Sequence, residues 1–567
     1  MILRSSVQDQ RSDLHGLNPP KPDEESPPSP PTKPCTVCSA PNSALIPCKS
    51  CNSTVYCSTM CKLKDGKNDL HDCLSYTILH EDRCGRLLMA ARDIKEGETI
   101  FTDAPAAVGP DNNPKPVCLT CYKRLPGLTY RCRYCSWPLC SPYCQVDDGP
   151  HARECCLFQI HSPRFSIEDY KVSCPSYNAI MVLRLLWLKE NKREVWDLID
   201  ILMDHLDVDK ELTKTKKGVI SFIRDHCKLT QFSEKEILHL MGIVDTNAYI
   251  IGENPNKDVD LQGLFPITSI LNHSCSANTI CFAGNDFTFT CRAVTDIKKG
   301  EELTTNYLHY HYHAFGLSYR NPELSSFWHF KCECRRCKDP SEFGTMSDSL
   351  ICPDCTLGRL LPLNDSSDSE WICGSCYGSQ PRKFVVNTIN TWWNTMEDHP
   401  KFDVIKLMEL LRKMKEVFDP NHYYCMEVKR RIIENIGETK GYEYESVAIP
   451  WLEKKVEFCK DHLNLQKVVA PGLSEYRAYM SVHCGEALYW LGKKRYVAME
   501  MTGPQLNTCM EEVANYLVKV VEIWGPYRRR SSERLRAEEA RGLLETIHEK
   551  YIQTKHLETA NRILKTE

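Results

Sequence analysis

Residues 263–307 read GLFPITSILNHSCSANTICFAGNDFTFTCRAVTDIKKGEELTTNY, and this stretch decides the fold. Two alternating runs within it, residues 279–282 and 287–293, predict strands joined by a turn at Gly284-Asn285-Asp286. Packing alone does not explain the tetrapeptide Asn272-His273-Ser274-Cys275 or the tyrosine that ends the stretch. We therefore expect a functional site built on a small β fold.

Length and charge narrow the class of protein. With 567 residues the chain is long enough for several domains, and its 71 basic and 75 acidic residues give a net charge of −4. No global positive field points to nucleic acid, so we expect no direct nucleic-acid binding. The first residues lack a secretory signal, and Arg184 interrupts the longest apolar stretch, residues 179–188. We expect a monomer of the cytoplasm and nucleus with no membrane partner.

The 32 cysteines of such a chain indicate metal sites rather than disulfides, because these compartments keep thiols reduced. Two clusters repeat one arrangement of closely spaced cysteines that ends in a histidine and a cysteine. Eight ligands in each suit two tetrahedral zinc ions, and the repeat makes chance spacing improbable. The first cluster comprises Cys35, Cys38, Cys48, Cys51, Cys57, Cys61, His71 and Cys73, and the second Cys118, Cys121, Cys132, Cys135, Cys140, Cys144, His151 and Cys155.

Two further cysteine groups follow the central stretch. Cys332, Cys334 and Cys337 leave a zinc ion one ligand short, and Cys275 is the natural fourth ligand. The other group has the pair spacing of a zinc ribbon, and its members are Cys352, Cys355, Cys373 and Cys376. The remaining cysteines are scattered, at positions 84, 156, 174, 227, 281, 291, 425, 459, 484 and 509, and we expect ordinary buried thiols there.

These motifs together resemble a known family. The second cysteine cluster is similar to the MYND zinc finger, and residues 83–101, RCGRLLMAARDIKEGETIF, look like the opening strands of a SET domain. A split SET domain with an inserted MYND finger resembles the SMYD family of protein-lysine methyltransferases, and the extra amino-terminal finger resembles its arthropod SmydA-like branch. The resemblance implies S-adenosylmethionine and zinc as cofactors. It also implies a lysine side chain of a histone or non-histone protein as substrate, and a role in transcriptional regulation.

In MYND fingers the ligands of two zinc ions alternate along the chain, so the resemblance implies how each cluster divides. In the first finger one zinc ion takes Cys35, Cys38, Cys57 and Cys61, and the other takes Cys48, Cys51, His71 and Cys73. The second finger divides into Cys118, Cys121, Cys140 and Cys144, and into Cys132, Cys135, His151 and Cys155. Asp69 stands where the family has its histidine, so Asp69 and His71 are both candidates. With the two later sites, the scheme predicts six zinc ions.

Methyl transfer to lysine needs a neutral amine in line with the methyl group. A free lysine with a pKa of about 10.4 lies about 4 kcal/mol from that form at neutral pH. A narrow apolar channel disfavours the ammonium form, and a tyrosine hydroxyl can orient the amine. The resemblance implies that Tyr307 is the catalytic residue. It implies that the methyl donor contacts Gly85, Arg86, Asn247, Asn272, His273, Tyr307 and Phe330, the last of which covers the adenine.

Two departures from the family pattern support an alternative function. Gly85-Arg86-Leu87 places a bulky residue at the second glycine of the usual Gly-x-Gly, and Ala277 replaces the usual proline before the last asparagine of the motif. The alternative is a catalytically weak or inactive SET scaffold. Such a scaffold would recruit protein partners, proline-rich peptides among them, through its MYND fingers.

The predicted fold class is α+β with several domains. Helical periodicity in residues 177–239 and from residue 386 onward predicts two all-helical parts. The predicted order is a disordered proline-rich tail (1–34), an N-terminal MYND-like finger (35–76), SET N-terminal strands (77–115), an inserted MYND finger (116–160), a helical SET insert (161–250), the core SET region (251–330), the post-SET zinc site and zinc ribbon (331–385), and a helical, TPR-like domain (386–567).

Overall fold

A computed structural model gives the fold of two compact units, Met1–Cys73 and Leu74–Glu567. The described residues are 35, 37–38, 46–47, 55–56, 58, 60–61, 75–81, 85–111, 115–161, 165, 167, 169–206, 212–251, 261–363, 369–529, 531–552 and 555–565. The predicted tail, residues 1–34, lies outside them. Within the described part the α+β fold class is confirmed.

The first unit contains one described pair of strands. β1 (Ile46–Pro47) pairs with β2 (Val55–Tyr56) in an antiparallel ladder. Tyr56 and Cys35 are buried. Short strands beside cysteine-bearing loops are typical of a zinc finger, in which the metal supplies the stability that a small core lacks.

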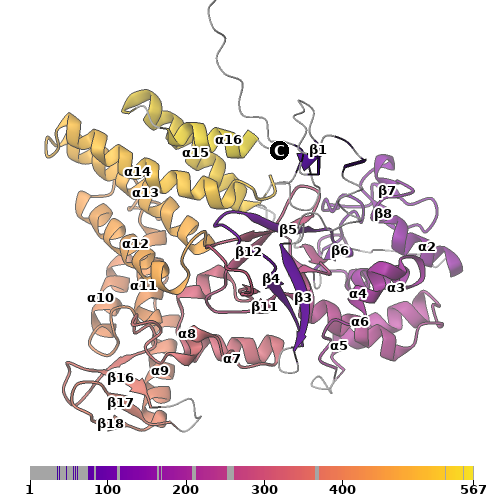
Figure 1. Ribbon diagram of the computed structural model, residues 1–567, viewed down its shortest axis with the longest axis horizontal. Coiled ribbons are helices and arrows are strands. Elements are labelled where there is room, and N and C mark those ends of the chain that lie inside the picture. The colour runs from indigo at the N-terminus through magenta and orange to yellow at the C-terminus, as the bar shows by residue number, and fades with distance from the viewer. Residues whose placement is uncertain are drawn as a thin grey trace, which may run out of the picture. The chain divides into compact units, whose positions relative to one another are not determined.

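A four-stranded sheet in the second unit joins segments that are far apart in sequence (Figure 1). Its strand order is β11 (Asn272–His273), β14 (Glu302–Thr305), β4 (Gly85–Ala90) and β3 (Tyr76–Glu81). Asn272 pairs with Thr304 in a parallel ladder, and the fully buried Leu303 pairs with Leu88 in an antiparallel one. This register brings the start of β4 close to the Asn-His-Ser-Cys motif.

The hairpin predicted from the central stretch is confirmed. β12 (Thr279–Ala283) pairs with β13 (Phe289–Ala293), whose other edge carries β5 (Thr99–Asp103). At the turn, the Gly284 amide donates to the Thr288 carbonyl at 2.9 Å. β13 begins two residues later than predicted because residues 284–288 form the turn.

Two turns of nearly identical sequence, DIKEGE at 93–98 and DIKKGE at 296–301, pack against each other through a bridge between their isoleucines. Each turn offers a lysine to the other's aspartate, and the Nζ–Oδ2 distances are 2.7 Å for Lys95–Asp296 and 2.9 Å for Lys298–Asp93. These exposed pairs contribute little stability individually. Their geometry fixes the connection that leads into β14.

The inserted finger and the helical insert share one hydrophobic core. The finger contains β7 (Tyr130–Arg131), β8 (Pro138–Leu139), the 3-10 helix η1 (Pro142–Cys144) and α2 (Ala152–His161). The insert contains η2 (Pro175–Ala179), α3 (Ile180–Asn191), α4 (Arg193–Ile199), α5 (Lys214–Ser221), the π-helix η3 (Phe222–His226) and α6 (Glu234–Asn247). A sheet of β6 (Ala107–Pro110), β10 (Leu261–Leu264) and β9 (Tyr249–Ile250) packs against α3 through β6.

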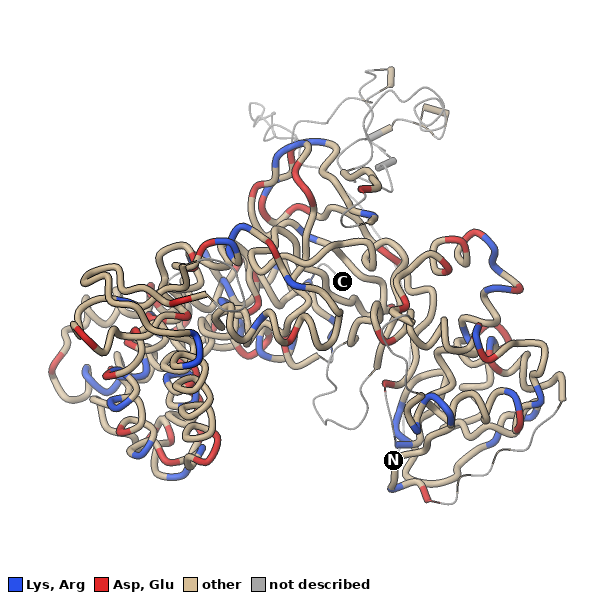
Figure 2. Tube along the Cα trace, turned by 90° about the horizontal axis from the view of Figure 1, so that it is seen from below, with Lys and Arg blue, Asp and Glu red and all other residues tan. Residues whose placement is uncertain are grey.

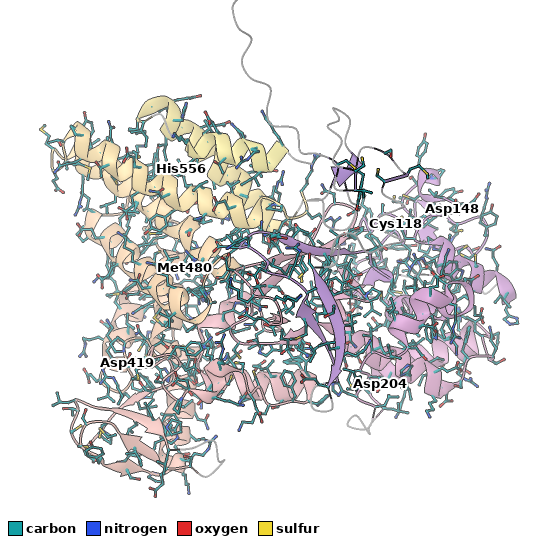
Figure 3. All side chains as sticks on the ribbon, viewed as in Figure 1. Cys118, Asp148, Asp204, Asp419, Met480 and His556 are labelled. Carbon is teal, nitrogen blue, oxygen red and sulfur yellow. The ribbon has the colours of Figure 1, made fainter. Side chains whose placement is uncertain are left out.

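Short elements surround and follow the central stretch. The helices are η4 (Thr268–Ile270), η5 (Tyr310–Ala314), α7 (Leu317–Trp328) and α8 (Arg335–Lys338). The ribbon strands pair in the order β15 (Leu350–Ile351), β16 (Arg359–Pro362), β17 (Trp371–Cys373) and β18 (Ser379–Gln380). Arg359 Nε lies 2.6 Å from Asp419 Oδ2, which ties this ribbon to the helical region (Figure 3).

The carboxyl-terminal part is helical, as predicted. Its helices are α9 (Arg382–Glu397), α10 (Val404–Met414), α11 (Tyr423–Asn435), α12 (Ile449–Val469), α13 (Glu475–Val497), α14 (Gly503–Trp524), α15 (Ser532–Lys550) and α16 (His556–Lys565). The predicted breaks at 419–421, 470–472 and 525–526 all fall between helices.

The helical region packs directly on the β12–β13 hairpin, which is called the SET hairpin below. The rings of Tyr527 and Phe282 stack at 4.8 Å between centroids. The guanidinium of Arg292 on β13 donates to the carbonyl of Glu522 at 3.2 Å, beside the end of α14. These contacts make the hairpin part of the same hydrophobic core as the carboxyl-terminal helices.

Charge is evenly mixed over the chain. Basic and acidic residues are interspersed over the described chain (Figure 2), in line with the small net charge of −4. Among the described residues, no helix has the length and apolarity needed to cross a membrane.

Candidate functional site

Asn272 connects three strands of the four-stranded sheet. Its amide nitrogen donates to Glu302 Oε1 at 2.9 Å on β14 and to the Arg86 carbonyl at 3.4 Å on β4. Both bonds use the nitrogen, so the amide oxygen is the group that this side chain offers to a ligand. Glu302 thus orients Asn272, a role that the sequence did not reveal.

Tyr307 follows β14 and is held at both ends. Its hydroxyl donates to the Leu271 carbonyl at 2.8 Å, and its backbone amide donates to His273 Nδ1 at 3.0 Å. Burial raises the pKa of the phenol, and nearby Glu302 raises it further. The hydroxyl is therefore neutral at physiological pH. It can orient a reacting group but cannot serve as an anionic base.

Aromatic rings surround Tyr307. The ring of Trp328 lies 5.3 Å from that of Tyr307, and the ring of Phe330 lies 5.9 Å from that of His273. The indole of Trp328 donates to the Thr246 carbonyl at 3.2 Å, which fixes it against the end of α6. The predicted Phe330 thus lies beside the predicted His273 and Tyr307. Trp328 was not predicted as a site residue, although it lies only two residues before the predicted Phe330.

Arg86 reaches from β4 to the helical insert. Its Nη2 donates to the Ile201 carbonyl at 2.8 Å, whereas its Nη1 is buried and has no hydrogen-bond partner among the described residues. Burial lowers the pKa of this guanidinium, yet arginine stays charged at neutral pH. A buried cationic N–H without a partner fits an anionic ligand group such as a carboxylate. Gly85, just before it, has a φ of 71°, a conformation that favours glycine.

Asn247, another predicted donor contact, is the last residue of α6. Its amide nitrogen donates to the carbonyls of Met203 at 2.8 Å and Ile243 at 2.9 Å. The side chain therefore fastens the loop after α4 to the end of α6. The same loop contains Asp204 (Figure 3), which lies 2.6 Å from His239 Nδ1.

Asn278, the last residue of the motif, clamps β14. Its amide nitrogen donates to the Glu302 carbonyl at 2.8 Å, and its oxygen accepts from the Thr304 amide at 2.8 Å. This pair of bonds holds the motif loop against the strand that leads to Tyr307. The sequence did not reveal this role of Asn278, because the role depends on a contact with Glu302, 24 residues further along the chain.

Cys275 joins the three cysteines of the post-SET segment. Its Sγ lies 3.5 Å from that of Cys337 and 3.9 Å from that of Cys332, and Cys334 completes the group. Four sulfurs about 2.3 Å from one zinc ion lie about 3.8 Å apart, so this set fits zinc. The buried Arg320 donates to Cys275 Sγ at 3.1 Å, which offsets part of the thiolate charge.

The other predicted ligand sets were located as far as the structure describes them. Within each set the ligand atoms lie within 4.8 Å of one another. The sets are Cys118, Cys121, Cys140 and Cys144; Cys132, Cys135, His151 and Cys155; Cys352, Cys355, Cys373 and Cys376; and, from the first finger, Cys35, Cys38 and Cys61. Cys48, Cys51, Cys57, Asp69, His71 and Cys73 lie outside the described residues.

The scattered cysteines are less uniform than expected. Cys281 and Cys291 are paired directly across β12 and β13, and Cys156 is exposed. Periodicity could not show this pairing, because it depends on the strand register.

Comparison with known proteins finds two domain families in this chain. The SET domain family matches residues 85–308, a span that includes the inserted finger, and the MYND finger family matches residues 35–73. SET domain-containing protein SmydA-8, isoform A, of Drosophila melanogaster is 27% identical over 391 residues, which cover 65% of this chain and 80% of the relative. Histone-lysine N-methyltransferase Smyd1 of Mus musculus is 26% identical over 388 residues, covering 64% and 72%.

A solved structure, Rubisco LSMT bound to AdoMet, aligns over 90% of this chain and 96% of that one with a TM-score of 0.25 and 12% identity, a likeness that carries no argument. The sequence matches and the ligand sets that fit zinc do support an assignment of the domains. The chain contains a SET domain and an amino-terminal MYND finger.

Proposed function

We propose that the protein transfers a methyl group from S-adenosylmethionine to a lysine side chain of another protein. The observation that carries this proposal is the convergence of Asn272 on β11, Arg86 on β4 and Tyr307 just after β14, the strand that lies between the other two. The relatives named as lysine methyltransferases support it.

The residues fit the donor as follows. The oxygen of Asn272 can accept from the donor's ammonium group, and Nη1 of Arg86 can pair with its carboxylate. Phe330 is placed to cover the adenine, in the ring cluster of His273 and Tyr307. When bound, S-adenosylmethionine supplies an electrophilic methyl group on a sulfonium.

On the lysine side, the chain supplies an aromatic, poorly solvated surface. The rings of Tyr307 and Trp328 disfavour an ammonium ion through desolvation and favour the neutral amine. The neutral hydroxyl of Tyr307, fixed by the Leu271 carbonyl, can hold the amine in line for displacement. These residues therefore orient the amine and favour its neutral form, and the lysine proton leaves to solvent water.

The substrate and setting form the finer part of the proposal. We propose a histone or non-histone protein as substrate, action in the cytoplasm and nucleus, and recruitment of peptide partners, proline-rich ones among them, through the MYND fingers. The clusters of cysteine thiols support a location in the cytoplasm and nucleus, because these compartments keep thiols reduced. A role in transcriptional regulation would follow from a histone substrate.

A scaffold without turnover is the second candidate. The observation in its favour is the hydrogen bond from Nη2 of Arg86 to the Ile201 carbonyl. This bond holds a bulky side chain next to Gly85. In that case Arg86 closes the donor site rather than binding the donor.

Transfer of a labelled methyl group separates the two candidates. Zinc-loaded protein is incubated with S-adenosylmethionine labelled in its methyl group and a protein library, with Tyr307→Phe as the matched variant. The enzyme proposal predicts labelled lysine with the wild type and a strong loss with the variant. No labelling by protein that retains its zinc would support the scaffold. Equal labelling with both proteins would contradict the role of Tyr307 in the transfer.

A further inference from the structure

Arg184 is the one charged residue in the apolar stretch 179–188, and its side chain is nevertheless only 1% exposed. It lies on α3 of the helical insert, and it points at the inserted finger. Its guanidinium donates to both oxygens of Glu154 at 2.8 Å each, the bidentate geometry that arginine and carboxylate prefer. It also donates to the Leu119 carbonyl at 3.0 Å and to the Tyr122 hydroxyl at 2.7 Å.

Glu154 in turn contacts a predicted zinc ligand. The carboxylate is fully buried, and its Oε1 lies 3.0 Å from Nδ1 of His151. The other ring nitrogen of His151, Nε2, lies 3.4 Å from Cys135 Sγ within the set of Cys132, Cys135, His151 and Cys155. Nδ1 therefore carries the proton and donates to Glu154, which leaves the Nε2 lone pair for the metal.

The arrangement also balances charge. A carboxylate buried alone would be very costly, and Arg184 is the cation that compensates it. All four ligands of this set are buried, whereas Cys121 of the finger's other set, to which Cys118 belongs (Figure 3), is exposed.

We propose that Glu154 and Arg184 are positioning residues for zinc at the buried site of the inserted finger. Glu154 fixes the tautomer and orientation of His151, and Arg184 holds Glu154 in place. Finger and insert build this metal site jointly, so the finger is structurally an integral part of the SET domain. These roles do not depend on methyl transfer.

The test uses the full-length protein and two measurements. Zinc release to a chelator is followed for the wild type, Glu154→Gln, Arg184→Met and the control Arg193→Met, whose side chain on α4 is 77% exposed. Loss of a partner of a metal-bound histidine typically weakens metal binding about 10- to 100-fold. We expect one zinc ion per chain to leave about ten times faster or more from both Glu154→Gln and Arg184→Met, and the wild-type rate from the control.

Cadmium-113 NMR of the cadmium-substituted proteins distinguishes positioning from general destabilisation. A site with three cysteines and one histidine resonates apart from all-cysteine sites because a nitrogen replaces a sulfur. We expect Glu154→Gln, which keeps the size of the side chain and removes its charge, to shift one resonance of the histidine-containing type and leave the all-cysteine resonances in place. Unchanged zinc release and an unchanged histidine-type resonance in Glu154→Gln would overturn the proposal, even if Arg184→Met failed to fold.

Discussion

Tyr307 is the residue on which the proposed chemistry depends most. Its hydroxyl is positioned by the Leu271 carbonyl and kept neutral by burial. Tyr307→Phe removes that hydroxyl and keeps the ring contacts with Trp328. We predict a fall in the rate of methyl transfer of about 100-fold, the usual effect of losing one positioned polar group at a reacting centre.

The same variant should retain its donor affinity. S-adenosylhomocysteine binding, measured by calorimetry, should stay within about twofold of the wild type, since ring contacts are unchanged. A variant that loses donor binding and rate together would show that Tyr307 acts through folding of the site instead.

The sequence revealed the site residues whose identity alone signals chemistry. Asn272, His273 and Tyr307 stood in one stretch, and the structure brings them together with Phe330. The orienting role of Glu302 could not be read from sequence, because it depends on a side-chain contact across 30 residues. The contact of Asn247 with the donor stays a prediction; its amide nitrogen donates to two backbone carbonyls.

Among the larger elements, the loop between α12 and α13 packs closely on Val294, the residue after β13, whose carbonyl accepts from the Leu473 amide at 3.0 Å. Gly472 has a φ of 80°, and an added Cβ would lie 1.6 Å from the Val294 carbonyl oxygen. We predict that Gly472→Ala lowers the free energy of unfolding by about 2 kcal/mol or more, from steric overlap and backbone strain. Denaturant unfolding measures this.

Gly503→Ala is the matched control for that loop. It lies in α14, and nothing lies within 4 Å of an added Cβ there. Its free energy of unfolding should stay within about 0.5 kcal/mol of the wild type. Similar values for the two variants would mean that the loop does not anchor the helices on the hairpin.

The start of α13 should confer a pH dependence on stability. Burial raises the pKa of Glu475 to about 7, the hydrogen bond from Tyr527 opposes this shift, and Glu533 adds to it. The folded state binds this proton more tightly than the unfolded chain, so the carboxyl destabilises the fold progressively as the pH rises from about 4.5 towards about 7.

Glu475→Gln removes that titration. We predict that the melting temperature of the variant, relative to the wild type, rises between pH 5 and pH 8. Thermal unfolding at both pH values measures the difference. A difference that is constant or falls with pH would contradict the assignment of this carboxyl.

At the same scale, the sequence predicted the hairpin 279–293 and three breaks between helices, because alternation and Pro or Gly are local signals. It did not reveal that β4, β11 and β14 lie in one sheet. Strand partners so far apart in the chain are chosen by packing, which leaves no local pattern.

The whole molecule is built around metal sites. Four complete ligand sets and Cys35, Cys38 and Cys61 of a fifth lie within the described residues. With the rest of the first finger, we predict close to six zinc ions per chain by elemental analysis of protein purified without chelators. A value near two would contradict the ligand scheme.

Most ligand sets were predictable at this scale because they contain closely spaced cysteine pairs of the kind that zinc requires. Cys275, 57 residues before Cys332, was predictable only as the ligand that the later group lacks. How the helical region packs on the SET hairpin was not. The stacking of Phe282 on Tyr527 joins residues that no motif relates, and only the folded core shows it.

Calorimetric titration of the zinc-loaded protein with S-adenosylmethionine tests the central claim most directly. We predict one binding site per chain, weakened about 10- to 100-fold in Arg86→Met by loss of the charged hydrogen bond to the donor carboxylate. Methylthioadenosine, which lacks that carboxylate, should bind both proteins alike. No binding of S-adenosylmethionine by protein with its full zinc content would contradict the claim that this site holds a methyl donor.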